Sequence, residues 1–224
     1  MGFEPLKVPL TELSAVPTRT SIPTEIQDID FVVVTSANAA RFATPDIIEA
    51  IVQSPVYAVG DATAAACRLA GLKHVYSVNG DAHALLAELA SQRSAGEEAL
   101  YLCGQLRRPT IELGLQRLNI EAVVAETYAT VKVSQLTDKL DFAFGGLPFG
   151  AAMLFSSFSA QIFREDVIPT LAPQHHENTP LFVISERAAQ EVDDSWGGPI
   201  IIAKEMRADV MHETVRSHFF PDKA

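Results

Sequence analysis

Residues 31–38 read Phe31-Val32-Val33-Val34-Thr35-Ser36-Ala37-Asn38. Four consecutive apolar residues, three of them β-branched, predict a strand that is buried on both faces, as the strands of parallel sheets are. The small polar residues after them predict a turn and the N-cap of an apolar helix. A strand followed at once by a helix is the repeating unit of α/β folds.

The same unit recurs along the chain. Further strands are predicted at 56–59, 75–78, 100–103 and 122–125, and again at 153–155, 181–184 and 199–202. Helical patterns separate them: one is expected to end near Gly71, one covers 83–91, and one opens at Pro109-Thr110, where proline suits the first turn. We therefore predict an α/β fold with parallel sheets that are covered on both faces.

Three of these units repeat at a nearly constant distance. Ser36 and Ser157 are 121 positions apart, and the strands that begin near 56 and 75 lie 125 positions before those near 181 and 200. The repeat favours two similar parallel-sheet α/β domains over one large domain, with the less regular residues 127–150 as the crossing between them. The alternative is that any parallel α/β chain aligns weakly with itself.

Composition excludes several classes of protein. Hydrophobic residues make up 48% of the chain, which supports a packed core and excludes disorder. The net charge of −11 argues against a nucleic-acid surface but not against an anionic ligand, because exposed charges are screened beyond about 8 Å. No apolar run approaches the length of about 18 residues that a membrane span needs, and no signal peptide is visible. Two cysteines build no disulfide or zinc framework, so we expect a reduced, cytoplasmic protein.

The junctions between strands and helices share one chemical property. The first N–H groups of a helix have no partner within the helix, and with the positive end of the helix dipole they attract anions. Junctions at the carboxyl ends of parallel strands point into one crevice, and two facing domains would surround one cleft with two such rims. A ligand with several carboxylates or phosphates fits this arrangement. For any single junction, ordinary N-capping is the alternative.

Other candidate motifs point to no further chemistry. The chain contains neither G-x-G-x-x-G nor G-x-x-x-x-G-K-[ST], so no motif supports a nucleotide site. His175-His176-Glu177 resembles a metal site but lies in the proline-rich loop 169–180 without a third ligand, which favours a solvated loop. Cys67 is expected in the core, and Cys103 as a small buried residue rather than a nucleophile. Arg107-Arg108 either binds carboxylate or solvates the start of a helix.

Five ordered segments resemble motifs of uroporphyrinogen-III synthases, and they span residues 30–190. Residues 30–39 resemble the T-S-x-N/R-A segment, 56–64 the V-G-x-x-T-A turn, and 101–108 the C/R-G-x-x-x-R turn. Residues 127–130 contain the Y-x-T motif as Tyr128-Ala129-Thr130, and 154–160 match F-F-S-P-x-S/A in part, with Ser157-Phe158 in place of the usual Pro-Arg.

The resemblance implies an enzyme of haem biosynthesis. Such an enzyme, a lyase, closes linear hydroxymethylbilane to uroporphyrinogen III, inverts the last pyrrole ring (ring D) and releases water. It uses no metal and no organic cofactor, its partner is the small-molecule substrate rather than nucleic acid or membrane, and it is a monomer. The rivals are a non-catalytic two-domain binder of a small polyanion and a nucleotide-dependent transferase of Rossmann type, against which the missing glycine-rich loop counts.

The resemblance also implies a domain layout. Two α/β domains are joined by a pair of antiparallel linker strands, with a cleft between the domains. Here the inserted domain is expected at 14–126, the discontinuous domain at 1–9 plus 134–224, and the linkers at 10–13 and 127–133. The family's first strand and helix precede a segment that matches Gly2–Leu10, so we expect the discontinuous domain to lack them and to leave backbone groups of the neighbouring strands unpaired.

Site residues carry over from the matching positions. Tyr128 is the predicted proton donor, because a phenol keeps its proton at neutral pH; the alternative is that it only packs the linker. The implied substrate-binding residues are Thr35, Ser36, Ala37, Asn38, Gly60, Asp61, Ala62, Thr63, Cys103, Gly104, Arg107, Ser156, Ser157, Ser185 and Arg187.

Overall fold

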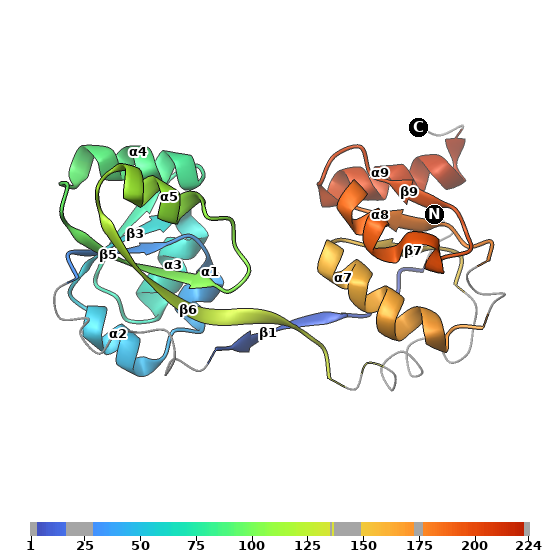
Figure 1. Ribbon diagram of the computed structural model, residues 1–224, viewed down its shortest axis with the longest axis horizontal. Coiled ribbons are helices and arrows are strands. Elements are labelled where there is room, and N and C mark those ends of the chain that lie inside the picture. Colours follow the sequence, from blue (N-terminus) through green and yellow to red (C-terminus); the bar gives the residue numbers. More distant parts are fainter. Residues whose placement is uncertain (1–3, 17–28, 135, 137–148, 173–176, 222–224) are drawn as a thin grey trace. The chain divides into compact units, whose positions relative to one another are not determined.

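The computed structural model describes residues 4–16, 29–134, 136, 149–172 and 177–221 (Figure 1). The chain divides into two compact units. The inserted unit is Leu13–Val131, and the terminal unit is Met1–Glu12 together with Lys132–Ala224. Each unit is built around a parallel sheet, so the predicted α/β fold with parallel sheets is confirmed.

The inserted unit holds a six-stranded sheet in the order β1-β6-β5-β2-β3-β4. Its strands are β1 (Thr11–Ala15), β2 (Phe31–Val34), β3 (Pro55–Val59), β4 (His74–Val78), β5 (Glu98–Gly104) and β6 (Glu121–Lys132). The strands from β6 to β4 are parallel to their neighbours. Strand β1 runs antiparallel to β6, since Val16 N donates to Thr127 O (3.0 Å) and Val133 N to Leu10 O (3.1 Å).

Helices cover both faces of this sheet. Side chains alternate along β2, so that Val32 and Val34 pack with α1 (Ala37–Arg41), α2 (Pro45–Ile51) and α3 (Asp61–Leu69). The intervening Phe31 and Val33 pack with α4 (Ala82–Gln92) and α5 (Thr110–Arg117), which lie together on one side of the sheet in Figure 1. Every β2 side chain is fully buried, which is why the strand carries no polar residue.

The single helix expected after Ser36 is two helices. Helix α1 ends at Arg41, and α2 begins at Pro45. Proline has no N–H to donate and disfavours the helical conformation in the residue before it, and Thr44 is accordingly extended (φ −71°, ψ 155°). The break therefore follows from Pro45.

Strand β6 contains a bulge opposite the end of β5. Cys103 pairs with Glu126, but the next residue of β5, Gly104, pairs with Tyr128. Thr127 is the extra residue, and an extra residue reverses the alternation of side chains beyond it. Tyr128 therefore packs on the α1–α3 side of the sheet, whereas without a bulge it would follow Glu126 to the α5 side.

The terminal unit holds a three-stranded parallel sheet in the order β7-β8-β9. The strands are β7 (Ala152–Leu154), β8 (Leu181–Val183) and β9 (Ile200–Ile202), and the helices are α7 (Ser157–Ile162), α8 (Glu186–Val192) and α9 (Ala208–Phe219). Short helical turns follow at Phe163–Val167 (π-helix), Ile168–Thr170 (3-10) and Asp193–Ser195 (3-10). This order parallels β2-β3-β4 of the inserted unit, strand for strand, at the offset found in the sequence.

The core of the terminal unit forms between this sheet and its helices. Leu181 and Phe182 of β8 and Met211 of α9 are fully buried, and Val8 from the start of the chain packs against the same cluster. Trp196 is 4% exposed and donates its indole N–H to Thr179 O (2.9 Å). Within the described ranges, the helices are all too short or too polar to cross a membrane.

Candidate functional site

The carboxyl ends of β2 and β5 meet at one edge of the large sheet, beside the part of β6 that contains Tyr128. Thr35 and Ser36 follow β2, Gly104 ends β5, and Tyr128 lies beside Gly104 on β6. Because these strands are neighbours in the order β6-β5-β2, residues from three separate predicted motifs come together here.

Tyr128 is held in place on several sides. Its hydroxyl donates to Ser36 Oγ at 3.3 Å, and the same oxygen accepts a hydrogen bond from Asn38 N at 3.2 Å. Its ring lies so close to Gly104 that a Cβ at that position would be 2.6 Å from Tyr128 Cζ. The ring of Phe42 packs against it with centroids 5.9 Å apart. The side chain is half-buried, so the hydroxyl lies in a fixed position at the edge of the sheet.

Thr127 connects β6 to helix α1 through a side-chain hydrogen bond. Its hydroxyl donates to Ala39 O at 2.9 Å, with a longer contact to Cys103 O at 3.4 Å, and only 1% of the residue is exposed. Sequence reasoning did not single out Thr127. The only signal was a polar residue at the end of an apolar strand, beside the tyrosine.

The side chain of Thr35 forms a hydrogen bond with a residue of the neighbouring strand. Its Oγ1 lies 3.1 Å from the hydroxyl of Tyr101 on β5. Burial raises the pKa of Tyr101, and the hydrogen bond with Thr35 partly offsets this. Thr35 therefore helps to satisfy a buried phenol, and its backbone is what it can offer to a ligand at the edge.

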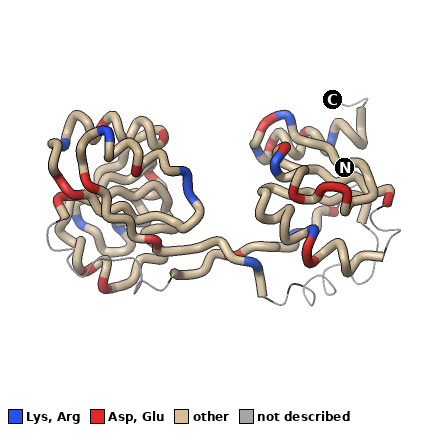
Figure 2. Tube along the Cα trace, viewed as in Figure 1, with Lys and Arg blue, Asp and Glu red and all other residues tan. Residues whose placement is uncertain are grey.

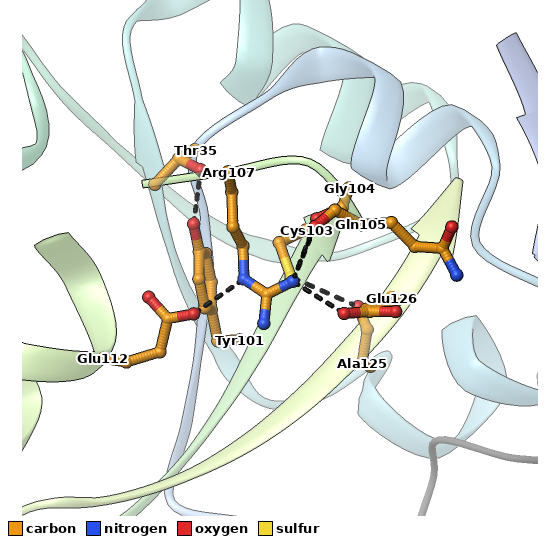
Figure 3. Close-up of polar contacts among 9 residues, drawn as sticks. All are labelled: Thr35, Tyr101, Cys103, Gly104, Gln105, Arg107, Glu112, Ala125 and Glu126. Carbon is orange, nitrogen blue, oxygen red and sulfur yellow. Dashed lines mark hydrogen bonds and ion pairs between the residues drawn. The ribbon is translucent and has the colours of Figure 1, made fainter. Parts of the chain in front are cut away.

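Arg107 lies between two carboxylates (Figure 3). Its Nε donates to Glu112 Oε1 at 2.6 Å and its Nη1 to Glu126 Oε1 at 2.7 Å. Nη1 also contacts the carbonyls of Gly104 (3.1 Å) and Gln105 (3.3 Å). Partial burial acts to lower the pKa of Arg107, but the hydrogen bonds to Glu126 and Glu112 outweigh it and raise the pKa above its usual value. The guanidinium thus has its partners within the protein.

Cys103 is a core residue, as expected from the sequence for a small buried residue at this position. It is 2% exposed, and its Sγ contacts Ala125 O at 3.9 Å. Burial raises the pKa of the thiol to about 12, so it is neutral at physiological pH. A protonated, buried thiol is neither a nucleophile nor an anion ligand, and only the backbone at this position remains available for substrate.

The turn after β3 reaches the same edge as β2. Gly60 adopts φ +75° before α3, a conformation that glycine accepts readily, and its N–H donates to Val78 O at 2.9 Å. Asp61 is exposed and accepts a hydrogen bond from Ser77 Oγ (2.7 Å). Ala62 is exposed, whereas Thr63 is 6% exposed and belongs to the buried side of the helix.

In the terminal unit, the predicted residues follow the neighbouring strands β7 and β8. Ser156 Oγ accepts from Ser159 N at 3.0 Å, and Ser185 Oγ accepts from Ala188 N at 3.2 Å. Both serines are therefore N-caps, as is Ser36, and each satisfies one N–H of its helix. Ser157 opens α7, and Arg187 in the first turn of α8 is exposed.

The metal-like triplet falls mostly outside the described residues, since only Glu177 of 175–177 is described. Among the residues whose structure is described, no group of three or more His, Cys, Asp or Glu side chains is arranged to hold a metal ion.

Comparison with known proteins gives one consistent result. The family model for uroporphyrinogen-III synthase HemD matches residues 1–213. The crystal structure of uroporphyrinogen-III synthetase from Helicobacter pylori superposes with a TM-score of 0.59 at 17% identity, covering 93% of this chain and 91% of that one. A mutant uroporphyrinogen III synthase from Thermus thermophilus gives a TM-score of 0.49 at 18% identity, covering 99% of this chain and 91% of that one. No curated protein sequence matches the chain.

Proposed function

The chain belongs to the uroporphyrinogen-III synthase family of cyclising lyases in tetrapyrrole biosynthesis, and we propose that Tyr128 is the proton donor of its reaction. The reaction closes hydroxymethylbilane to uroporphyrinogen III with inversion of ring D and loss of water. Loss of the hydroxyl group as water requires a proton, and a phenol at the edge of the sheet can supply it.

One observation supports Tyr128 above the other titratable groups. Its hydroxyl is fixed by Ser36, whose Oγ is itself fixed by Asn38 N, and its ring is fixed by Gly104 and Phe42. A donor in one position reduces the entropy cost of reaching the transition state. Of the other titratable groups predicted at this edge, the Cys103 thiol is buried and neutral, the Arg107 guanidinium is held between Glu112 and Glu126, and Asp61 is exposed.

The substrate's carboxylates suit the backbone donors at the same edge. We propose that residues 35–38, 60–63 and Gly104 of the inserted unit contribute to substrate binding, with Ser156, Ser157, Ser185 and Arg187 of the terminal unit. The serine N-caps occupy one N–H of each helix, and in α1 a second, Ala39 N, donates to Ser36 O. We propose that other N–H groups of the first turns, which lack partners within the helix, bind the carboxylates. Ring closure also requires that the linear substrate be bent until its two ends meet. The protein achieves this by positioning the substrate, which does not depend on the acid strength of Tyr128.

We propose in addition that the domains lie at 14–126 and at 1–9 plus 134–224, with linkers at 10–13 and 127–133. The antiparallel hydrogen bonds from Val16 N to Thr127 O and from Val133 N to Leu10 O support a two-stranded linker. A monomer that works in the cytoplasm stays a prediction from the sequence.

The decisive experiment supplies enzymatically generated hydroxymethylbilane and separates the I and III isomers after oxidation. The wild-type protein should form isomer III, whereas isomer I alone, the spontaneous product, would support the non-catalytic binder. Tyr128→Phe should slow formation of isomer III about a hundredfold, at the low end of general acid catalysis because the intermediate is itself reactive.

Tyr76→Phe is the matched control for this variant. Tyr76 is 54% exposed on β4 and stacks on Tyr57. Its loss of a hydroxyl should leave the rate unchanged. Both variants should fold normally, because a half-buried hydrogen bond is worth about 1 kcal/mol. Full activity in Tyr128→Phe would remove Tyr128 from the mechanism.

A further inference from the structure

We propose that Arg108 binds a carboxylate of the substrate, and that Arg107 beside it is a positioning residue that holds the loop between β5 and α5 against β6. The inference rests on the proposed function, because it concerns the same edge of the large sheet. It assigns different tasks to two arginines that are adjacent in sequence.

Arg107 has a structural task that substrate binding would disrupt. Glu112 and Glu126, its two partners, are only 25% and 28% exposed in their side chains, and they come from α5 and β6 respectively. If Arg107 turned to a substrate carboxylate, these two half-buried carboxylates would lose their counter-charge. They would also repel the approaching anion, since the three side chains together carry a net charge of −1.

The same contacts fix the course of the loop. Arg107 Nη1 binds the carbonyls of Gly104 and Gln105, and Gln105 N donates to Tyr128 O at 2.9 Å. Gly104 in turn lies against the ring of Tyr128. Arg107 therefore connects the loop to the strand that carries the proposed proton donor, and loosening it should disturb Tyr128.

Arg108 is the next residue of this fixed loop and is exposed. Within the described part of the chain, its side chain has neither a hydrogen bond nor an ion pair with another residue. Figure 2 shows this loop between β5 and α5 in blue, the colour of Lys and Arg. In a chain of net charge −11, an unpaired cation on a loop whose residues Gly104 and Gln105 contact Tyr128 is suited to a polycarboxylate.

Arg108→Gln tests the binding role, with Arg117→Gln as the matched control. Arg117 is also exposed and lies at the other end of α5, in its last turn. With hydroxymethylbilane as substrate, Arg108→Gln should raise KM about tenfold at unchanged kcat, as expected for loss of one charge-assisted hydrogen bond. The difference from wild type should shrink in added salt, and Arg117→Gln should behave as wild type.

Arg107→Gln tests the positioning role. Well below its melting temperature it should lower kcat while the salt dependence of KM stays as in wild type. The urea midpoint of Arg107→Gln should be lower than that of wild type. In a Glu126→Gln background the same substitution should lower the midpoint by less, because the ion pair between Arg107 and Glu126 is already lost there. A variant that raises KM with an unchanged midpoint, independently of Glu126, would show that Arg107 is itself the ligand.

The outcomes separate this inference from the function on which it rests. A wild-type protein that makes only isomer I refutes the function. A wild-type protein that makes isomer III, with the same KM in Arg108→Gln as in Arg117→Gln, refutes the role of Arg108 alone.

Discussion

Gly104→Ala should displace the ring of Tyr128, because the added methyl group would overlap with it. A Cβ built on Gly104 lies 2.6 Å from Cζ, 2.9 Å from Cε2 and 3.0 Å from the hydroxyl oxygen of Tyr128. To restore an ordinary contact of about 3.4 Å, the ring has to move by roughly 0.8 Å, although it is held by Phe42 and Ser36. Overpacking of this kind costs about 1–3 kcal/mol in the free energy of unfolding.

Urea denaturation followed by circular dichroism measures this cost. Gly150→Ala is the matched control, because a Cβ at Gly150 meets no atom within 4 Å, and it should change the free energy of unfolding by less than about 0.5 kcal/mol. Gly104→Ala should also slow formation of isomer III, because the Tyr128 hydroxyl leaves its position at Ser36.

A double-mutant cycle identifies the clash as the cause. In a Tyr128→Ala background the space beside Gly104 is free, so Gly104→Ala should cost much less there than in wild type. The reasoning is refuted if the cost is the same in both backgrounds, or if Gly104→Ala is as stable as Gly150→Ala.

Two further predictions concern the buried groups around the site. Thr127→Val should lower the free energy of unfolding by about 1–3 kcal/mol, because it leaves the buried carbonyl of Ala39 without its donor, whereas Thr130→Val should not; equal urea midpoints would contradict this. Burial raises the pKa of Cys103 to about 12 and of Cys67 to about 11, so both thiols should resist iodoacetamide at pH 8 until the protein is unfolded. Because the thiols ionise near pH 9 when unfolded, stability should fall from about pH 9 towards pH 12, and replacing both by alanine should flatten that fall in a pH series of urea titrations.

Much of the fold was predictable because its strands are buried on both faces. Such strands must be continuous apolar runs, and the run Phe31–Val34 marks β2 without any tertiary information. The N-caps could also be predicted from the sequence. Ser36, Ser156 and Ser185 each precede a helix, and the side chain of each accepts a hydrogen bond from an N–H group of its first turn.

The details of the site depend on contacts between distant residues. The choice between two tasks for Arg107 is made by Glu126, which lies 19 positions further along the chain on another strand. The bulge at Thr127 shows only in the pairing of β6 with β5, and it decides that Tyr128 faces Ser36. Neither feature has a local pattern that hydrophobic periodicity or turn chemistry could detect.

The extra residue in β6 limits how this strand can change in evolution. Deleting Thr127 would restore even pairing with β5 and keep Tyr128 opposite Gly104 on the same face, but it would remove the hydroxyl that donates to Ala39 O. A one-residue deletion earlier in the strand would instead place the side chains that follow it, such as the buried Ala125, on the opposite face of the sheet. Single-residue gaps in comparisons with other members of the family are therefore expected at Thr127 or in the loops that flank β6, rather than in the regularly paired residues before it.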